Sequence, residues 1–326
     1  MASLCGCALW GLASAALAQG VPTFSSRVEV VKLDVSVTRG GRPVEGLGAA
    51  DFEVIDDGVR QEVELLEREK ATLETVLLLD TSQSVAGRKL VDLKEAVGRF
   101  VEGLGSEDRA SLITFASQVR QRVRESGDRD ALLAALGQVE AVGMTSLCDA
   151  LLLGLAQLRP GERRPVLVVF TDGADLLSWL TPEEVEAAAR RSEAVVYVVS
   201  SEEAPVRRRL DPLGLIEGRG RAGLGSLGPV PLPGGAGPPE QAPRASVSEW
   251  LEKLAIASGG IVFRSRQNQL TESFLAVLEA LKNRYLLRYQ PSGVDSEGWH
   301  GLKVRTLRKG GDVKTREGYF AVGVNP

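Results

Sequence analysis

Short apolar runs with almost no polar interruption constrain this chain more than any other feature. They occupy 75–79, 166–170 and 194–199, and a further strand-like segment lies at 111–115. A strand that is apolar at successive positions is typical of a parallel sheet covered on both faces. Between the runs, apolar residues recur at helical spacing, as over 88–103. This alternation predicts an α/β fold with a doubly wound, mostly parallel open sheet of the Rossmann type.

Both ends of the chain show a different pattern, in which apolar and polar residues alternate over short segments. Such segments recur within 26–70 and again within 285–320. Because an open α/β sheet can receive and return the chain on the same side, we expect both flanks to pair into one small β-sandwich. The predicted organisation is therefore an α/β domain over 72–284, inserted between the sandwich halves 19–71 and 285–326.

Turn sequences and alternation also predict smaller elements of the flanks and of the sheet. The sequence D-D-G at 56–58 is a hairpin turn, and we place Val63 and Leu65 on its return strand. Residues 119–123 are predicted to run antiparallel to the strand before them. Residues 313–320 are predicted to form β-structure near the end of the chain.

Two segments fall outside these folded units. Residues 1–18 are apolar and end in Ala-Leu-Ala, so we expect a signal peptide and an exported protein, whether periplasmic, envelope-associated or extracellular. After cleavage Cys148 is the one remaining cysteine, which leaves no intramolecular disulfide. Residues 203–246 are crowded with Gly and Pro, and we expect them to form a mobile insertion. No later segment is predicted to span a membrane.

Composition excludes several classes of function. The 39 Lys and Arg residues are outnumbered by 43 Asp and Glu residues, so an unspecific grip on nucleic acid is not expected. With one His and three Cys, a zinc site of several His or Cys ligands cannot be assembled. The P-loop and the G-x-S-x-G nucleophile elbow are both absent. The sequence therefore favours a binding module over an enzyme and leaves the oligomeric state open.

Five oxygen-bearing side chains are predicted to meet at one edge of the sheet. Asp80, Ser82 and Ser84 follow the first apolar run, Asp172 follows the second, and Thr145 precedes a predicted helix. Carboxylates and hydroxyls without His or Cys suit Mg²⁺, and also Mn²⁺ or Ca²⁺. Two carboxylates roughly neutralise such an ion, so a carboxylate from another molecule can complete its coordination. The plainer alternative is that both aspartates are helix N-caps.

The D-x-S-x-S run, the later threonine and the T-D-G sequence at 171–173 resemble the metal-ion-dependent adhesion site of von Willebrand factor A-type domains. The resemblance covers about 75–285. It implies that the hydroxyls of Ser82, Ser84 and Thr145 contact the metal. It also implies that the two carboxylates act directly or through water.

The flanking sequences GRPVEGLGAADFEVIDDGVRQEV and NRYLLRYQPSG resemble the secreted bacterial family labelled VWFA-related Acidobacterial domain. We therefore expect an exported protein-binding or adhesion-type module that recognises an Asp or Glu of a partner protein through a divalent metal. Two alternatives stay open. One is an architectural subunit of an envelope assembly with a structural metal site, and the other is a metal-dependent hydrolase.

Overall fold

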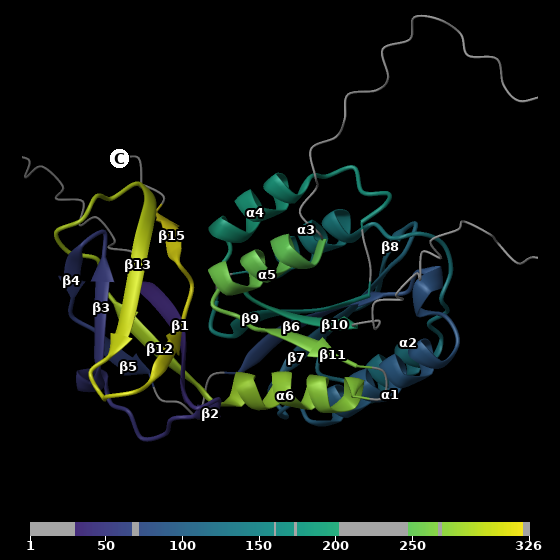
Figure 1. Ribbon diagram of the computed structural model, residues 1–326, viewed down its shortest axis with the longest axis horizontal. Helices are drawn as coiled ribbons and strands as arrows, with labels where there is room; N and C mark the ends of the chain where they lie inside the picture. The colour runs from purple at the N-terminus through teal and green to yellow at the C-terminus, as the bar shows by residue number, and fades with distance from the viewer. Residues whose placement is uncertain are drawn as a thin grey trace, which may run out of the picture.

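The computed structural model places an α/β domain beside a β-sandwich (Figure 1). The structure describes residues 30–66, 72–159, 161–172, 175–201, 247–266 and 269–321. The predicted signal peptide and the predicted insertion at 203–246 lie outside the described residues. Within the described residues, no helix is both long enough and apolar enough to cross a membrane.

A six-stranded sheet forms the centre of the α/β domain, in the order β11-β10-β9-β6-β7-β8. The first five strands of that order are parallel to one another, and β8 at the edge pairs with β7 in the antiparallel sense. The predicted α/β fold with a mostly parallel sheet is thus confirmed, together with the antiparallel segment at 119–123. The strands are β6 Leu73–Asp80, β7 Arg109–Phe115, β8 Val119–Ser126, β9 Arg164–Thr171, β10 Val195–Ser201 and β11 Val262–Ser265.

Helices cover both faces of this sheet, which explains why its strands are apolar at successive positions. Helices α1, α2 and α6 lie against one face, and α3, α4 and α5 against the other (Figure 1). Neighbouring residues of one strand therefore enter different cores, as Leu77 and Leu78 do. The helices are α1 Arg88–Glu102, α2 Arg129–Gly137, α3 Leu147–Gln157, α4 Pro182–Arg191, α5 Val247–Ala257 and α6 Leu270–Lys282, with short 3-10 turns η1 Ala49–Asp51 and η2 Gln83–Val85.

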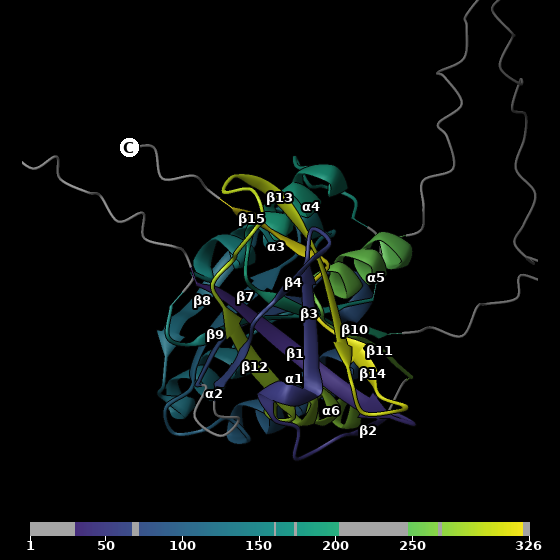
Figure 2. The same ribbon diagram turned by 90° about the vertical axis from the view of Figure 1, so that its left-hand side faces the viewer.

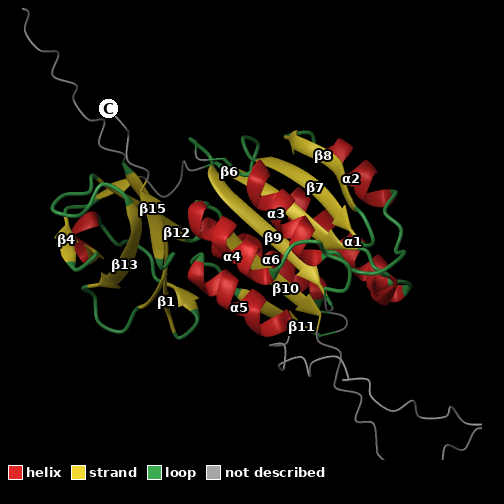
Figure 3. Cartoon of the chain, turned by 90° about the horizontal axis from the view of Figure 1, so that it is seen from above, coloured by secondary structure: helices red, strands yellow, loops and turns green. Residues whose placement is uncertain are grey.

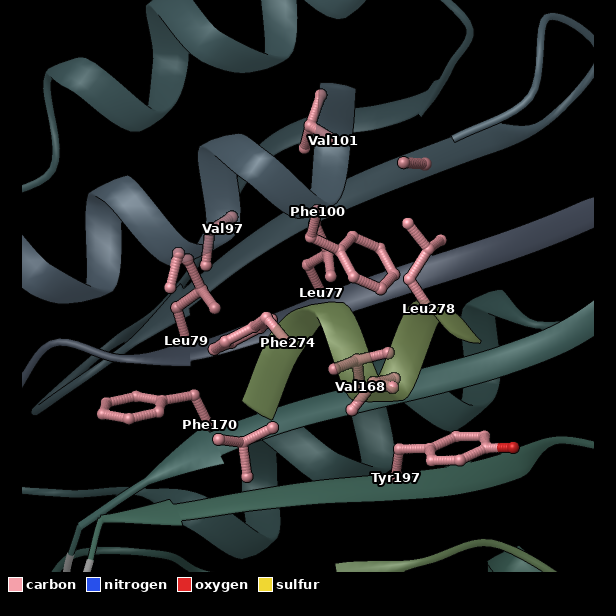
Figure 4. Close-up of a cluster of buried hydrophobic side chains, with 14 of the residues drawn as sticks. Leu77, Leu79, Val97, Phe100, Val101, Val168, Phe170, Tyr197, Phe274 and Leu278 are labelled. Carbon is pink, nitrogen blue, oxygen red and sulfur yellow. The ribbon is translucent and has the colours of Figure 1, made fainter. Parts of the chain in front are cut away.

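Three phenylalanines anchor the core beneath α1 and α6 (Figure 4). The Phe274 ring lies 6.2 Å from that of Phe100 on α1 and 6.5 Å from that of Phe170 on β9, measured between centroids. All three side chains are fully buried. Because each such burial contributes about 1.5–3 kcal/mol, this cluster holds the two helices firmly on the sheet.

The sandwich consists of two sheets, each built from both ends of the chain (Figure 2). One sheet has the order β14-β1-β12-β5, with β2 beside β1, and the other has the order β15-β13-β3-β4. Leu33, Val54 and Leu287 lie fully buried between them. The strands are β1 Val31–Arg39, β2 Arg42–Pro43, β3 Phe52–Asp56, β4 Val59–Gln61, β5 Glu64–Leu66, β12 Arg284–Tyr289, β13 Gly298–Thr306, β14 Asp312–Lys314 and β15 Gly318–Ala321.

Two predicted details of the sandwich are wrong. The hairpin turn at 56–58 is present, but its return strand is β4, which ends before Val63. Leu65 belongs to β5, which pairs with β12 in the other sheet. The segment 313–320 is likewise divided, because β14 pairs with β1 in one sheet while β15 pairs with β13 in the other. In both places the chain crosses between sheets where alternation alone predicts continuous pairing.

A buried ionic cluster joins the sandwich to the α/β domain. Asp34 on β1 forms ion pairs with Arg164, at 2.6 Å from Nη2 to Oδ2, and with Arg284 on β12. Arg284 also donates from Nη1 to the Tyr197 hydroxyl at 3.0 Å and from Nη2 to the Gly259 carbonyl at 2.9 Å. Burial alone would raise the pKa of Asp34, but the two guanidinium groups hold it below its usual range.

Candidate metal centre

The side chains predicted to bind a metal come from three loops at the carboxyl-terminal edge of the sheet. Asp80 ends β6, and the turn η2 follows it directly. The loop that carries Thr145 is fastened to this turn, because the Gln83 amide donates to the Gly143 carbonyl at 2.9 Å. Asp172 follows β9, the sheet neighbour of β6. The parallel order of the strands thus brings the three loops together.

Hydrogen bonds link four of the five predicted residues, and the side chains of Ser82, Ser84 and Asp172 form a chain of oxygen atoms. The hydroxyls of Ser82 and Ser84 lie 2.9 Å apart, and Ser84 donates to Oδ1 of Asp172 at 2.6 Å. Asp80 accepts the Ser82 amide on Oδ1 at 2.9 Å and the Thr171 hydroxyl on Oδ2 at 2.9 Å. These contacts fix the Asp80 carboxylate against the loop and link it to the neighbouring strand.

Thr145, the fifth predicted residue, is buried on the adjoining loop, with 4% of its surface exposed. Its carbonyl oxygen accepts the amides of Leu176 at 2.9 Å and Leu177 at 3.0 Å. The structure therefore ties the Thr145 loop to the segment after Asp172. Among the described residues, no hydrogen bond links the Thr145 hydroxyl to the oxygen chain.

Neither aspartate is a helix cap among the described residues, so the plainer alternative does not hold. The carboxylate of Asp80 is engaged by Ser82 and Thr171, and the N-cap of α1 is Gly87. The carboxylate of Asp172 contacts Ser84 and Lys89. Both groups thus serve the loop cluster.

The family model for the von Willebrand factor type A domain matches residues 75–174, the segment that carries these loops. The α/β domain has a von Willebrand factor A-like fold, and we call it the A domain. Such domains generally mediate protein–protein interaction or adhesion, and they typically bind a divalent cation at a metal-ion-dependent adhesion site.

Curated relatives match about a third of this chain. Over 128 residues, the chain is 24% identical to inter-alpha-trypsin inhibitor heavy chain H4 of Sus scrofa and 27% identical to heavy chain H3 of Homo sapiens. The two matches cover 36% and 35% of this chain, and 14% of each relative. The chain thus spans about a seventh of the length of the curated relatives it matches.

Solved structures with a similar fold include a von Willebrand factor type A protein from Catenulispora acidiphila. It is 12% identical to this chain with a TM-score of 0.48, and the match covers 92% of this chain and 75% of that chain. Proximal thread matrix protein 1 from the mussel byssus, described with a zinc-occupied MIDAS motif, is 14% identical with a TM-score of 0.48, over 69% of this chain and 49% of that chain. BatB from Bacteroides thetaiotaomicron is 19% identical with a TM-score of 0.44, over 64% and 97% of the two chains.

The oxygen chain of this A domain fits a small divalent cation. Mg²⁺ takes oxygen ligands at about 2.0–2.1 Å in octahedral geometry, so adjacent ligands lie about 2.9 Å apart. The two serine hydroxyls have this separation, and the contact between Ser84 and Asp172 is slightly shorter. Burial raises the pKa of Asp80 above its ordinary value, and the charge of Asp172 adds to this shift. A bound cation would offset that penalty.

Sequence reasoning missed Lys89, which lies in the first turn of α1. Its Nζ is 3.0 Å from Oδ2 of Asp172 and 3.2 Å from the Ser84 carbonyl oxygen. The two side chains of this ion pair are 12% and 2% exposed. Two features of the sequence indicate this role. Lys89 is a cation at a helix N-terminus, where the helix dipole disfavours positive charge. A long side chain at this position also points back toward the preceding loop.

Asp149 and Asp175 also organise this edge of the A domain. The spacing of Ser146 and Asp149 is typical of a capping box, but Asp149 accepts the amides of Trp179 and Leu180 instead, at 3.2 and 3.1 Å. The first turn of α3 is satisfied by Asp175, which accepts the Cys148 amide at 3.0 Å. These two carboxylates therefore bind the segment after Asp172 to the start of α3.

A second group of possible ligands lies in the sandwich. Oxygen and nitrogen atoms of Asp56, Asp57 and His300 lie within 4.8 Å of one another, close enough to share a metal ion. Oδ1 of Asp56 is 3.0 Å from Nδ1 of His300, and its Oδ2 accepts the hydroxyls of Tyr289 and Tyr319 at 2.7 and 2.8 Å. Because both oxygens of Asp56 are engaged, this geometry favours a buried hydrogen-bond network over a metal site.

Proposed function

We propose that this A domain binds a partner protein through a divalent cation, with Mg²⁺ as the best-fitting ion and an Asp or Glu of the partner as the final ligand. The observation that carries the proposal is the chain of hydroxyl and carboxylate oxygens at the strand ends, bordered by exposed apolar side chains. The cation would supply an electrophilic centre for the partner's carboxylate. Ser82, Ser84, Thr145, Asp80 and Asp172 would hold it.

Exposed apolar residues beside the oxygen chain favour a protein partner over a small solute. Trp179 is 95% exposed and Leu176 is 61% exposed, and both follow Asp172 in the chain. Val142 and Met144, on the loop fastened to η2, are 65% and 46% exposed. Clustered exposed apolar side chains mark interaction surfaces, and tryptophan is prominent among residues that dominate binding energy. We define these four residues as the apolar border.

The alternative of a hydrolase finds neither a histidine nor a reactive thiol at this edge among the described residues. The chain has one histidine, His300, and it is buried in the sandwich beside Asp56. Cys148 is buried too, and desolvation first, then the carboxylate of Asp175, raises the pKa of its thiol, so it is a poor nucleophile. A binding role needs neither group. We further propose that the protein is exported, on the evidence of residues 1–18.

A selection from a phage-displayed library of random dodecapeptides tests this function. Peptides retained in Mg²⁺ and released by a chelator should contain Asp or Glu, and Asp172→Asn should abolish their binding. Trp179→Ser should weaken peptide binding and leave Mg²⁺ binding unchanged. Leu307→Ser, at an equally apolar but distant residue that is 56% exposed, is the matched control. Selected peptides without acidic residues, or binding that persists in chelator, would contradict the proposal.

A further inference from the structure

A cavity of about 310 Å³ lies between the A domain and the sandwich. Its walls come from α4, α5, β13 and the segment that leads into β15. Figures 1 and 3 show that α4 and α5 extend to the side of the sheet that faces the sandwich. The arrowheads of the parallel strands, whose carboxyl ends carry the candidate metal centre, point away from the sandwich. Ligand sites often form at domain interfaces, and about 300 Å³ is the lower end of their size range, which suits a small molecule.

Apolar surface makes up most of the cavity wall. Trp299 on β13 is 39% exposed, and Ile256 on α5 is 53% exposed, although each lies at a junction between two folded units. The Arg190 guanidinium covers one part of the indole, 5.5 Å from the ring centroid. The exposed remainder of Trp299 offers a flat apolar surface to a ligand ring.

Three cations line the same cavity without a close carboxylate. They are Arg190 on α4, Lys253 on α5 and Arg316 before β15. Among the described residues, none of the three has a carboxylate oxygen within 4.0 Å, although Glu186 and Glu317 also lie on the wall. The cavity therefore combines an apolar surface with a surplus of unpaired positive charge.

Arg316 adds a hydrogen-bond donor that lacks an acceptor. One edge of its guanidinium is held by the sandwich, since Nη2 donates to the Lys32 carbonyl at 2.9 Å. Its Nε is buried and has no hydrogen-bond partner in the described part of the chain. A buried donor without an acceptor costs free energy, and a small shift of the guanidinium toward the cavity would let a bound anion accept from it.

We propose that this inter-domain cavity binds a small organic anion, a carboxylate attached to an aromatic ring or a short acyl body. The apolar body would lie against Trp299 and Ile256. The carboxylate would lie among Arg190, Lys253 and Arg316. This site is separate from the candidate metal centre and does not depend on the function proposed for it. Because its walls belong to both folded units, a bound anion also stabilises their association.

The test compares two matched probes on the full chain. Saturation-transfer NMR with 1-naphthoate and with the neutral 1-naphthamide measures whether the negative charge is recognised. We expect 1-naphthoate to bind more tightly, and Lys253→Gln to weaken it about fivefold, as expected for loss of one partly exposed ion pair. Trp299→Ala should weaken both probes.

Arg60→Gln is the control, because it removes an exposed cation from β4, which does not line the cavity. Circular dichroism melts establish that each variant is folded, and Lys253 is exposed, so its replacement is tolerated. Binding should be the same with and without a chelator, which separates this site from the metal centre. Equal binding of the two probes, no binding of 1-naphthoate, or an equal effect of Lys253→Gln and Arg60→Gln would overturn the proposal.

Discussion

Removal of the Asp34 carboxylate should cost this protein much of its stability. Asp34 neutralises two buried guanidinium groups, those of Arg164 and Arg284, whose side chains are 7% and 1% exposed. Breaking a buried ion pair by deleting one partner typically costs about 3–5 kcal/mol, because a charge is left buried and unpaired. Arg284 keeps its contacts with Tyr197 and Gly259 in Asp34→Ala. We therefore expect about 3 kcal/mol, the lower end of that range.

The pH dependence of this effect follows from the lowered pKa of Asp34. A carboxyl group whose folded pKa lies below its ordinary value of 3.8 stabilises the fold fully above that value. The contribution is lost as the pH falls through the folded pKa. The difference in unfolding free energy between the wild type and Asp34→Ala should thus be constant near neutral pH and shrink below about pH 3.8.

Urea unfolding at pH 7, followed by far-UV circular dichroism, measures the difference directly. Asp295→Ala removes an exposed carboxylate from a loop of the same sandwich and should change the unfolding free energy by less than about 0.5 kcal/mol. A loss below about 1 kcal/mol in Asp34→Ala would refute the reasoning, since it would mean that the two arginines find other partners or water at no cost.

Three further predictions concern single side chains. Asp80→Asn should raise the melting temperature of the chelator-treated protein at pH 7. The pKa of Asp80 is raised by folding, so the carboxylate lowers stability as the pH rises above 3.8. A lower melting temperature would contradict this. Cys148 should react with a thiol reagent such as Ellman's reagent only after unfolding, because burial raises its pKa, and fast labelling of the folded protein would show this wrong. Tyr319→Phe should cost about 1–3 kcal/mol in urea unfolding, because Asp56 loses a buried donor, and an unchanged midpoint would count against the network.

The centre of the fold was predictable because it depends on local patterns. A strand buried on both faces must be apolar at successive positions, and 166–170 satisfies this requirement without help from the rest of the chain. Helix α4 also has local sequence signals, since Thr181, Pro182 and Glu184 supply the cap, the first residue and the capping box. The boundaries proposed at 71/72 and 284/285 stay a prediction.

Individual side-chain contacts between distant residues could not be predicted. The partner of Asp34, Arg164, is 130 positions away in the sequence, and no local pattern indicates that they meet. The local sequence around Lys89 and Asp149 is also consistent with other roles. Their contacts with Asp172 and Trp179 form only because the fold brings three loops together. The division of 313–320 between two sheets escaped prediction because alternation does not distinguish one sheet from another.

Calorimetric titration of Mg²⁺ into the full chain tests the central claim most directly. We predict one Mg²⁺ per wild-type chain and no detectable binding to Asp80→Ala, with both proteins showing the same circular dichroism spectrum. Asp56→Asn, in the sandwich group of possible ligands, should bind Mg²⁺ like the wild type. Undiminished binding to Asp80→Ala, or loss of binding in a folded Asp56→Asn, would contradict the assignment of the metal to the strand ends of the A domain.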